Sequence, residues 1–345
     1  MKSSAAYTLY LLQKRRYFIT MMILSFLIVV IGVCSLKYGA MSISWGKLFS
    51  NDALAGQVVF ELRLPRMLAS LLVGGALALS GVLMQGLFRN PLADPALLGM
   101  TSGASLFAML FLLSSSFFVT TSSFLSEWGL AISAFIGSLV VTYLTYLLSL
   151  TKGKSNIALL VLSGVAINAL CGAVMGFLTY LSSDDTLRSI TFWSMGSLAN
   201  IDWLDVYLLL PFILMALFLV KRSAKYLNAM ICGEEYAKTL GLNVQKEKTK
   251  AILAIALLVG ISTAVAGPIS FVGLVVPHIM RFLIGHDQKY LMLLSTIFGA
   301  LLVGFSDVLS RVILSPAEIP IGLITAIIGA PYFMYLLLNM KYKGI

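Results

Sequence analysis

Long apolar runs recur along the whole of this 345-residue chain, and they restrict its fold more than any other feature. A helix needs about 20 apolar residues to cross the hydrocarbon core of a bilayer. Inside that core every backbone N–H and C=O group must be paired within the protein, which favours helices for runs of this length. We therefore expect an all-α polytopic membrane protein with about ten transmembrane helices. The expected spans are residues 18–36, 65–87, 96–118, 128–150, 157–180, 203–220, 250–267, 271–284, 290–307 and 319–338.

The composition predicts one membrane domain and no separate soluble domain. Apolar residues make up 59% of the chain and charged residues 11%, whereas soluble proteins carry about 25% charged residues. The longest polar segment, at about residues 222–249, is too short to bury a core of its own. Residues 1–345 are thus expected to form a single transmembrane domain. The eighth span, 271–284, is short and contains Pro277, so we expect it to be broken or partly re-entrant.

The residue types that usually carry catalysis or bind metals are few and scattered. The three cysteines lie far apart and show no CxxC or Cys/His spacing, which argues against a metal site or a disulfide framework. Ser163 precedes Gly164, but the first glycine of a GxSG motif is missing, so packing explains this pair of small residues. The chain has no phosphate-binding loop. We expect neither an enzyme nor a cofactor-binding protein.

Basic residues are distributed unevenly between the two sides that ten spans would create. Both termini would lie on one side, and that side would hold 18 of the 24 lysines and arginines. Cytoplasmic loops carry the excess of basic residues, so the termini are expected in the cytoplasm. The net charge of +10 then follows from topology and requires no nucleic-acid partner. The basic residues of the outer side are Lys37, Lys47, Arg63, Arg66, Arg188 and Arg311.

Three of these outer arginines suggest a site. Arg63 and Arg66 lie three residues apart at the start of an apolar run, with Pro65 between them, and so project from one side of a helical turn. Arg311 lies between the ninth and tenth spans, four residues after Asp307. One interpretation is snorkelling at the interface or a local Asp307–Arg311 pair. The other is a docking surface for an acidic partner, because guanidinium groups bind carboxylates in bidentate fashion.

A short amphipathic helix is predicted inside the cytoplasmic polar segment. Two glutamates open it, and a glycine follows its last turn in the position of a C-cap. Such a helix has little to bury against within its own loop. It either lies on the membrane surface or inserts into a cytoplasmic partner. Its candidate contact residues are Gly233, Glu234, Glu235, Tyr236, Ala237, Lys238, Leu240, Gly241 and Leu242.

Polar residues are rare within the spans, and this bears on the source of energy for any transport. Coupling to protons or sodium usually needs ionisable groups near the bilayer midplane. Asn168 in the fifth span is the main candidate there, and a packing hydrogen bond explains it equally well. An ion-coupled carrier therefore remains only a secondary alternative.

Between the second and third spans, Pro91 and Pro95 predict a tight turn, with Asp94 as a cap for the next helix.

Six motifs stand in a characteristic order, and they cover nearly the whole chain. Together they closely resemble the permease subunit of ABC importers for iron–siderophores, haem and vitamin B12, of the type II importer fold. The motifs are Arg63-Leu-Pro-Arg66, Ser80-Gly81 with Gln85-Gly86, Asn90-Pro-Leu-Ala-Asp-Pro95 with Leu98-Gly99, Gly233-Glu-Glu through Leu240-Gly241, Gly273-Leu-Val-Val-Pro-His-Ile-Met-Arg281, and Glu318-Ile-Pro-Ile-Gly322 with Gly329-Ala-Pro331.

The resemblance implies partners as well as a fold. It implies a homodimer in the bacterial inner membrane with two cytoplasmic ATPase subunits, which bind ATP-Mg, and a substrate-binding protein outside. Arg63, Arg66 and Arg311 would receive acidic residues of that binding protein, and residues 233–242 would form the coupling helix held by the ATPase. The fifth and tenth spans would line the pathway, and residues 185–199 would include a short gate helix. The pathway candidates are Ser163, Asn168, Gly322 and Thr325.

The substrate expected from the resemblance is an iron complex, either haem or a ferric siderophore. The sequence from Phe88 to Asp94 looks most like permeases of that kind. Vitamin B12 is the alternative substrate, and an ion-coupled secondary transporter is the alternative mechanism.

Overall fold

The computed structural model describes residues 2–39, 53–118 and 123–342, and almost all of them are helical. Eight helices are long and apolar enough to cross a membrane, and the shorter apolar segments Met100–Ser114 and Val272–Ile284 occupy the third and eighth expected spans. Each of the ten expected spans thus coincides with a helix of the described chain. These helices are α1 (Lys2–Lys37), α4 (Leu64–Phe88), α5 (Met100–Phe118), α6 (Ser123–Leu148), α7 (Ile157–Tyr180), α9 (Trp203–Val220), α12 (Val244–Ala266), α13 (Val272–Ile284), α14 (Gln288–Val312) and α15 (Ile321–Tyr342).

Short elements connect the long helices. A short helix expected within residues 185–199 is present as α8, and the short helix expected within residues 233–242 is present as α11; their roles stay predictions. A two-stranded antiparallel hairpin joins α6 to α7, with Leu150 opposite Ser155. The short elements are α3 (Ala53–Gln57), the π-helical turn η1 (Val58–Arg63), the 3-10 turn η2 (Pro95–Leu98), β1 (Leu150–Thr151), β2 (Lys154–Ser155), α8 (Asp184–Ser194), α10 (Ser223–Ile231) and α11 (Glu234–Thr239).

The second expected span is longer than the sequence suggested. A start at Pro65 was expected, but α3, η1 and α4 form one continuous helix from Leu54 to Phe88. Proline lacks an N–H group and cannot close the usual backbone bond to the preceding turn. The π-helical turn directly before Pro65 accommodates this without ending the helix. Arg63 and Arg66 therefore lie within a helix and not at its mouth.

The central helices pack closely through small residues. The helices α4 and α12 are the most buried spans, and α14 packs along α4. At the crossing of α4 and α14, Gly74 faces Gly299, where a Cβ atom on either residue would overlap the other helix. Gly81 meets the carbonyl of Gly273 on α13 in the same way. Such contacts let helix backbones approach closely in lipid, where dispersion forces drive packing.

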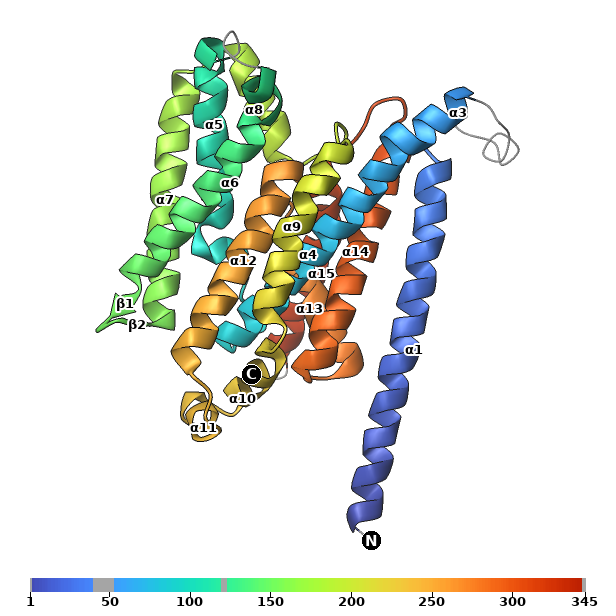
Figure 1. Ribbon diagram of the computed structural model, residues 1–345, viewed down its shortest axis with the longest axis vertical. Coiled ribbons are helices and arrows are strands. Elements are labelled where there is room, and N and C mark those ends of the chain that lie inside the picture. Colours follow the sequence, from blue (N-terminus) through green and yellow to red (C-terminus); the bar gives the residue numbers. More distant parts are fainter. Residues whose placement is uncertain (1, 40–52, 119–122, 343–345) are drawn as a thin grey trace.

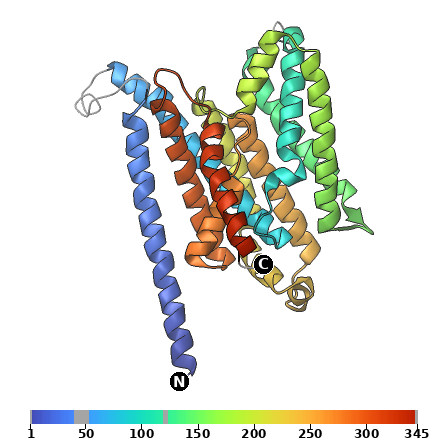
Figure 2. The ribbon, with the colours of Figure 1, turned by 180° about the vertical axis from the view of Figure 1, so that it is seen from behind.

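Three groups of helices stand side by side across the molecule (Figure 1). The helices α5, α6 and α7, capped by α8, form one flank, while α4, α9, α12, α13, α14 and α15 form the centre. The opposite flank is α1, which packs on α14. Seen from behind, α15 lies in front of the central group (Figure 2). The helices α10 and α11 lie at the end of the molecule where α1 begins and α15 ends, as an even number of spans requires.

The segment between α4 and α5 returns into the helix bundle and is not a simple surface turn. Asp94 accepts a hydrogen bond of 2.8 Å from the backbone N–H of Ala96, so it caps η2 and not α5. The side chain of Asn168, halfway along α7, donates to the carbonyl of Ala96 at 3.1 Å. Because η2 occupies residues 95–98, the third span begins at Met100, later than the expected residue 96.

Candidate docking and coupling sites

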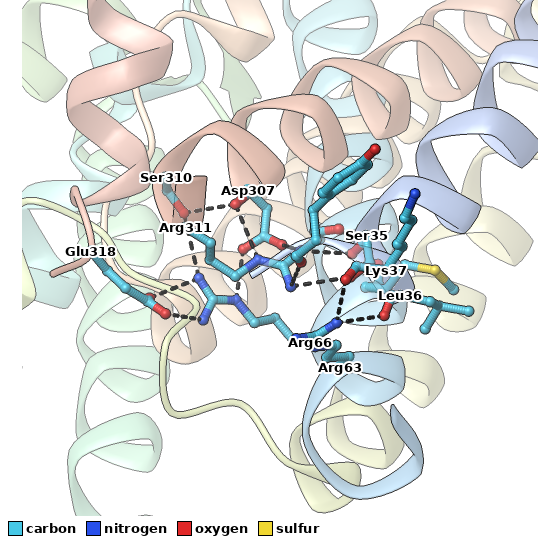
Figure 3. Close-up of polar contacts among 12 residues, drawn as sticks. Ser35, Leu36, Lys37, Arg63, Arg66, Asp307, Ser310, Arg311 and Glu318 are labelled. Atoms are coloured by element: carbon cyan, nitrogen blue, oxygen red, sulfur yellow. Dashed lines mark hydrogen bonds and ion pairs between the residues drawn. The ribbon is translucent and has the colours of Figure 1, made fainter. Parts of the chain in front are cut away.

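The three outer arginines converge on one cluster, at the end of the molecule opposite α11 (Figure 3). The end of α1, the first part of α4, the end of α14 and the loop before α15 meet there. Arg63, Arg66 and Arg311 are all buried, with 6%, 7% and 5% of their surfaces exposed. Polar side chains at such depth must be paired, because an uncompensated buried charge is strongly destabilising.

Arg66 forms the centre of this arginine cluster. Its Nε donates to Asp307 Oδ1 at 2.7 Å, and Asp307 is completely buried. Its two terminal nitrogens reach both carboxylate oxygens of Glu318, at 3.0 and 2.9 Å (Figure 3). The fork-to-fork geometry with Glu318 is the strong bidentate form of an arginine–carboxylate pair. Arg66 therefore joins α4 to both α14 and the loop before α15.

The other two arginines bind the end of α1. Arg311 forms an ion pair of 2.8 Å with Asp307, and its Nη2 donates to the hydroxyl of Ser35 at 2.7 Å. The expected local Asp307–Arg311 pair is thus confirmed. Arg63 donates to the backbone carbonyls of Leu36 and Lys37, each at 2.7 Å (Figure 3). Free carbonyls end every helix, and here guanidinium groups satisfy those of α1.

The arginine cluster has a direct bearing on the predicted docking role. It contains three guanidinium groups and two carboxylates, so positive charge remains in excess. In this arrangement Glu318, whose side chain is 34% exposed, occupies the two terminal nitrogens of Arg66 that an incoming carboxylate would need. Docking through Arg66 therefore requires Glu318 to leave it. The docking assignment itself stays a prediction.

The candidate coupling segment forms a compact element between α10 and α12. Gly233 precedes α11 with a φ of 111°, and Gly241 follows it with a φ of 75°, a backbone region that suits glycine. Leu240 is the C-cap residue, so Gly241 lies one position beyond the cap. Ala237 is fully buried, whereas Tyr236 and Leu240 are about half exposed. The apolar face of α11 is therefore divided: Ala237 packs within the subunit, whereas Tyr236 and Leu240 remain open to a partner.

The two glutamates of this segment each form an ion pair with a lysine. Lys248 on α12 is buried and donates to Glu234 at 2.5 Å, which fastens the first turn of α11 to a long span. Lys238 pairs with Glu235 within α11, and both are exposed. The hydrogen bond to Glu235 raises the pKa of the Lys238 ammonium. On α10, burial and then the nearby charge of Glu234 raise the pKa of the Tyr226 hydroxyl.

The pathway candidates lie on α7 and α15, and the structure does not bring them together into one site. Asn168 bonds to the segment between α4 and α5, as the packing alternative required, and Ser163 is half-buried on α7. Thr325 is 2% exposed and donates to the carbonyl of Gly322. Gly322 lies against the carbonyl of Met195, at the end of α8. These contacts give Asn168, Gly322 and Thr325 packing roles within the subunit, and a role in the pathway stays a prediction for all four residues.

Both helices nevertheless present broad apolar faces that no described part of the chain covers. About a fifth of each span is buried, against about four-fifths of α4 and α12. The uncovered side chains on α7 include Leu162, Leu170 and Phe177, and those on α15 include Ile327 and Tyr335.

Sequence reasoning missed Glu318 and Lys248 as members of these clusters. Glu318 follows a cis peptide bond at Ser315-Pro316 in a loop, where no periodicity assigns it a partner. Lys248 lies near the start of an expected span and was counted only as a topological charge. Lys248 is one of four charged residues directly before the apolar run that begins at Ala251, so the sequence carried no specific signal for its buried ion pair.

Comparisons with known proteins decide the family. Residues 27–339 match the family model described as the FecCD transport family. The chain belongs to this family. It is a permease of the ABC importer group for iron–siderophores, haem and vitamin B12, as the six motifs implied, and a multi-pass membrane protein.

The relatives of this FecCD permease are named after two different substrates. The hemin transport system permease protein HmuU of Yersinia pestis is 42% identical over 318 residues, which are 91% of this chain and 94% of the relative. The vitamin B12 import system permease protein BtuC of Serratia proteamaculans is 39% identical over 343 residues, or 99% of each chain. A solved structure described as an inward-facing conformation of a putative metal-chelate type ABC transporter superposes with a TM-score of 0.82. It is 34% identical and covers 92% of this chain and 98% of that one.

Proposed function

We propose that this FecCD permease imports an iron complex, haem or a ferric siderophore, across the bacterial inner membrane. The observation that carries this proposal is the 42% identity to the Yersinia pestis hemin permease over 91% of the chain. The likeness to a metal-chelate type transporter supports the same substrate class. Vitamin B12 is the alternative substrate, since B12 permeases are 39% identical over 99% of the chain.

The working assembly that we infer is a homodimer with two ATPase subunits and a binding protein. The uncovered apolar faces of α7 and α15 favour a second copy of this chain against them, with the pathway between the copies. Each ATPase, which binds ATP-Mg, would hold α11 and residues 233–242. Its closure would move α11, and the helix bundles would rock to alternate access to the pathway.

The orientation follows from the distribution of charge. The end of the molecule with α10, α11 and the β1–β2 hairpin carries most of the basic residues, including Lys154, Arg222 and Lys246. By the positive-inside rule this end faces the cytoplasm, with both termini. The arginine cluster then faces the binding protein on the outer side.

The docking role requires an exchange of carboxylates. An acidic residue of the binding protein would displace Glu318 from Arg66, while Asp307 stays in place. Replacing Glu318 by Gln leaves Arg66 with a weaker partner, so this variant is expected to bind the binding protein more tightly. Glu235→Gln on the opposite side serves as the control. Equal affinity of wild type and Glu318→Gln would count against docking through Arg66.

Transport assays in proteoliposomes test the substrate and the mechanism together. The permease is reconstituted with its ATPase and binding protein, and uptake of haem, a ferric siderophore and vitamin B12 is measured with ATP. We expect uptake of one iron complex that depends on ATP and persists with an ionophore. Uptake of vitamin B12 alone would establish the alternative substrate. Uptake by the permease without its ATPase, abolished by an ionophore, would establish an ion-coupled carrier.

A further inference from the structure

A cavity of about 230 Å³ lies where the ends of α4, α10 and α13 meet the start of α14. Its lining joins two motifs to which the proposed transport function gives no role, the sequence from Gln85 to Pro91 and the end of α13 at Arg281. Arg89, Arg281 and His286 line it, and none of its described lining residues is acidic. The cavity is therefore rich in hydrogen-bond donors and positive charge.

Arg281 has no counterion within the described parts of the chain. Its Nη2 donates to Gln85 Oε1 at 2.9 Å, and that amide in turn donates to the carbonyl of Leu274. Its Nη1 is buried and has no hydrogen-bond partner. Arg281 is partly buried as a residue, and its charge is partly desolvated without an anion beside it, so an anion in the cavity would lower the cost of this desolvation.

Gln288 supplies a second unmet group in the same cavity. The residue is 3% exposed, and its Oε1 is buried without a partner. Its Nε2 faces the carbonyl of His286 at 3.4 Å, which fixes the orientation of the amide, because the opposite orientation would place two acceptors together. The site therefore lacks an anionic acceptor beside Arg281 and a donor beside Gln288.

Arg89 stands in an unusual backbone conformation at this cavity. It is the C-cap of α4 with a φ of 50° and a ψ of 32°, a left-handed position usually held by glycine or asparagine. Its side chain is exposed and makes no hydrogen bond or ion pair within the described part of the chain. It also lines the neighbouring cavity of about 330 Å³ that contains Lys154 and Lys248.

We propose that this cavity binds a phosphate group that carries a hydroxyl donor. The phosphate oxygens would accept from Arg281 and Arg89, and the hydroxyl would donate to Gln288. A carboxylate side chain accepts only and would leave Gln288 unpaired. Two sources offer this chemistry, the headgroup of phosphatidylglycerol and inorganic phosphate as its monoanion.

The location favours the lipid as the source. Basic cavities between helices at the cytoplasmic face bind anionic headgroups, and the placement of this cavity at that face rests on the proposed topology. Phe282, next to Arg281, is 86% exposed and offers an apolar surface beside the charged site. The binding chemistry itself does not depend on the transported substrate, so it can fail or hold independently of the importer assignment.

Thermal unfolding of the delipidated full-length permease tests the proposal. Mixed micelles with phosphatidylglycerol, mixed micelles with phosphatidylcholine, and inorganic phosphate are titrated separately. We expect phosphatidylglycerol to raise the melting temperature and phosphatidylcholine to have no effect. Arg281→Gln should weaken apparent binding about tenfold or more, the usual effect of losing a hydrogen bond to a charged group, and Gln288→Leu should weaken it about two- to tenfold, because its bond to the hydroxyl joins two neutral groups. The exposed Arg222→Gln, outside the cavity, should bind as wild type does.

Arg89→Gln keeps the test decisive if Arg281→Gln does not fold, because Arg89 is exposed. Stabilisation by inorganic phosphate as well as by lipid would make free phosphate a sufficient ligand, and stabilisation by phosphatidylglycerol alone would assign the lipid. No stabilisation of the wild type, or equal stabilisation of the variants, would overturn the proposal. Loss of ATPase assembly in Arg89→Gln without any effect of phosphate would overturn it in favour of a carboxylate of the ATPase.

Discussion

Removal of one charge from the arginine cluster should destabilise the subunit far more than removal of a charge at the surface. Asp307 is fully buried and contacts Arg66 at 2.7 Å and Arg311 at 2.8 Å. Asp307→Asn keeps the volume of the side chain but leaves two buried guanidinium groups with one carboxylate, that of Glu318. Breaking a buried ion pair in this way usually costs about 3–5 kcal/mol.

The remaining contacts reduce that cost. Arg66 keeps its bidentate contact with Glu318, and Arg311 keeps its hydrogen bonds to Ser35. We therefore expect a loss near the lower limit of about 3 kcal/mol in the free energy of unfolding. Glu235→Gln is the matched control, since its pair with Lys238 is exposed, and exposed pairs contribute about 0–1 kcal/mol.

Unfolding of the purified permease in mixed micelles, followed by tryptophan fluorescence against denaturant concentration, measures both variants. A double variant, Arg66→Met with Asp307→Leu, adds a further check. It removes both charges, so it should lose less stability than the sum of the losses measured for Arg66→Met and Asp307→Leu as single variants. If Asp307→Asn lost no more than Glu235→Gln, or if the double variant were additive, the cluster would not act as a buried network.

Three further predictions concern coupling, packing and the loop between α4 and α5. Lys248→Glu should lower the amount of substrate transported per ATP, because α11 loses its ion pair with α12. The double variant Lys248→Glu with Glu234→Lys should restore the wild-type ratio of substrate to ATP. A ratio that stays low in the double variant would contradict a coupling role for this ion pair. Gly81→Ala places a methyl group on the carbonyl of Gly273 and should cost about 1–3 kcal/mol or more, seen as a lower melting temperature. Gly172→Ala, which meets no atom within 4 Å inside α7, should melt at or slightly above the wild-type temperature, because alanine has the higher helix propensity. Asn168→Leu should lower stability by about 0.5–1.5 kcal/mol, the usual contribution of one hydrogen bond, because the carbonyl of Ala96 keeps the N–H of Gly99 as a donor; unchanged stability would mean that the bond from Asn168 contributes nothing.

The helices were predictable from the sequence because each long apolar run must satisfy its own backbone in lipid. The limits of α7 and α9 follow directly from a cap before the run, Asn156 for α7 and Asp202 for α9. The extension of α4 back to Leu54 was not predictable, since a proline before an apolar run is typical of a helix start. The choice depends on tertiary contacts of Arg63 and Arg66 that local sequence does not encode.

The candidate sites were predictable in composition but not in pairing. Charge counting placed Arg63, Arg66 and Arg311 on one side, and the spacing of four residues suggested the Asp307–Arg311 pair. The bidentate partner of Arg66, Glu318, lies 252 residues away in the chain. Contacts at that separation depend on how α4 and α14 cross, which is set by small residues such as Gly74 and Gly299 and not by any charge pattern.

The continuous helix from Leu54 to Phe88 has a mechanical consequence. At 1.5 Å per residue its 35 residues extend about 50 Å, well beyond the about 30 Å of a hydrocarbon core. Arg66 lies about a third of the way along this helix, and its far end carries Gln85 and leads directly to Arg89. A single stiff rod thus reaches from the face where a binding protein would dock to the cavity proposed for phosphate. A tilt of this rod would alter both faces of the membrane at once, without any relay of side chains between them.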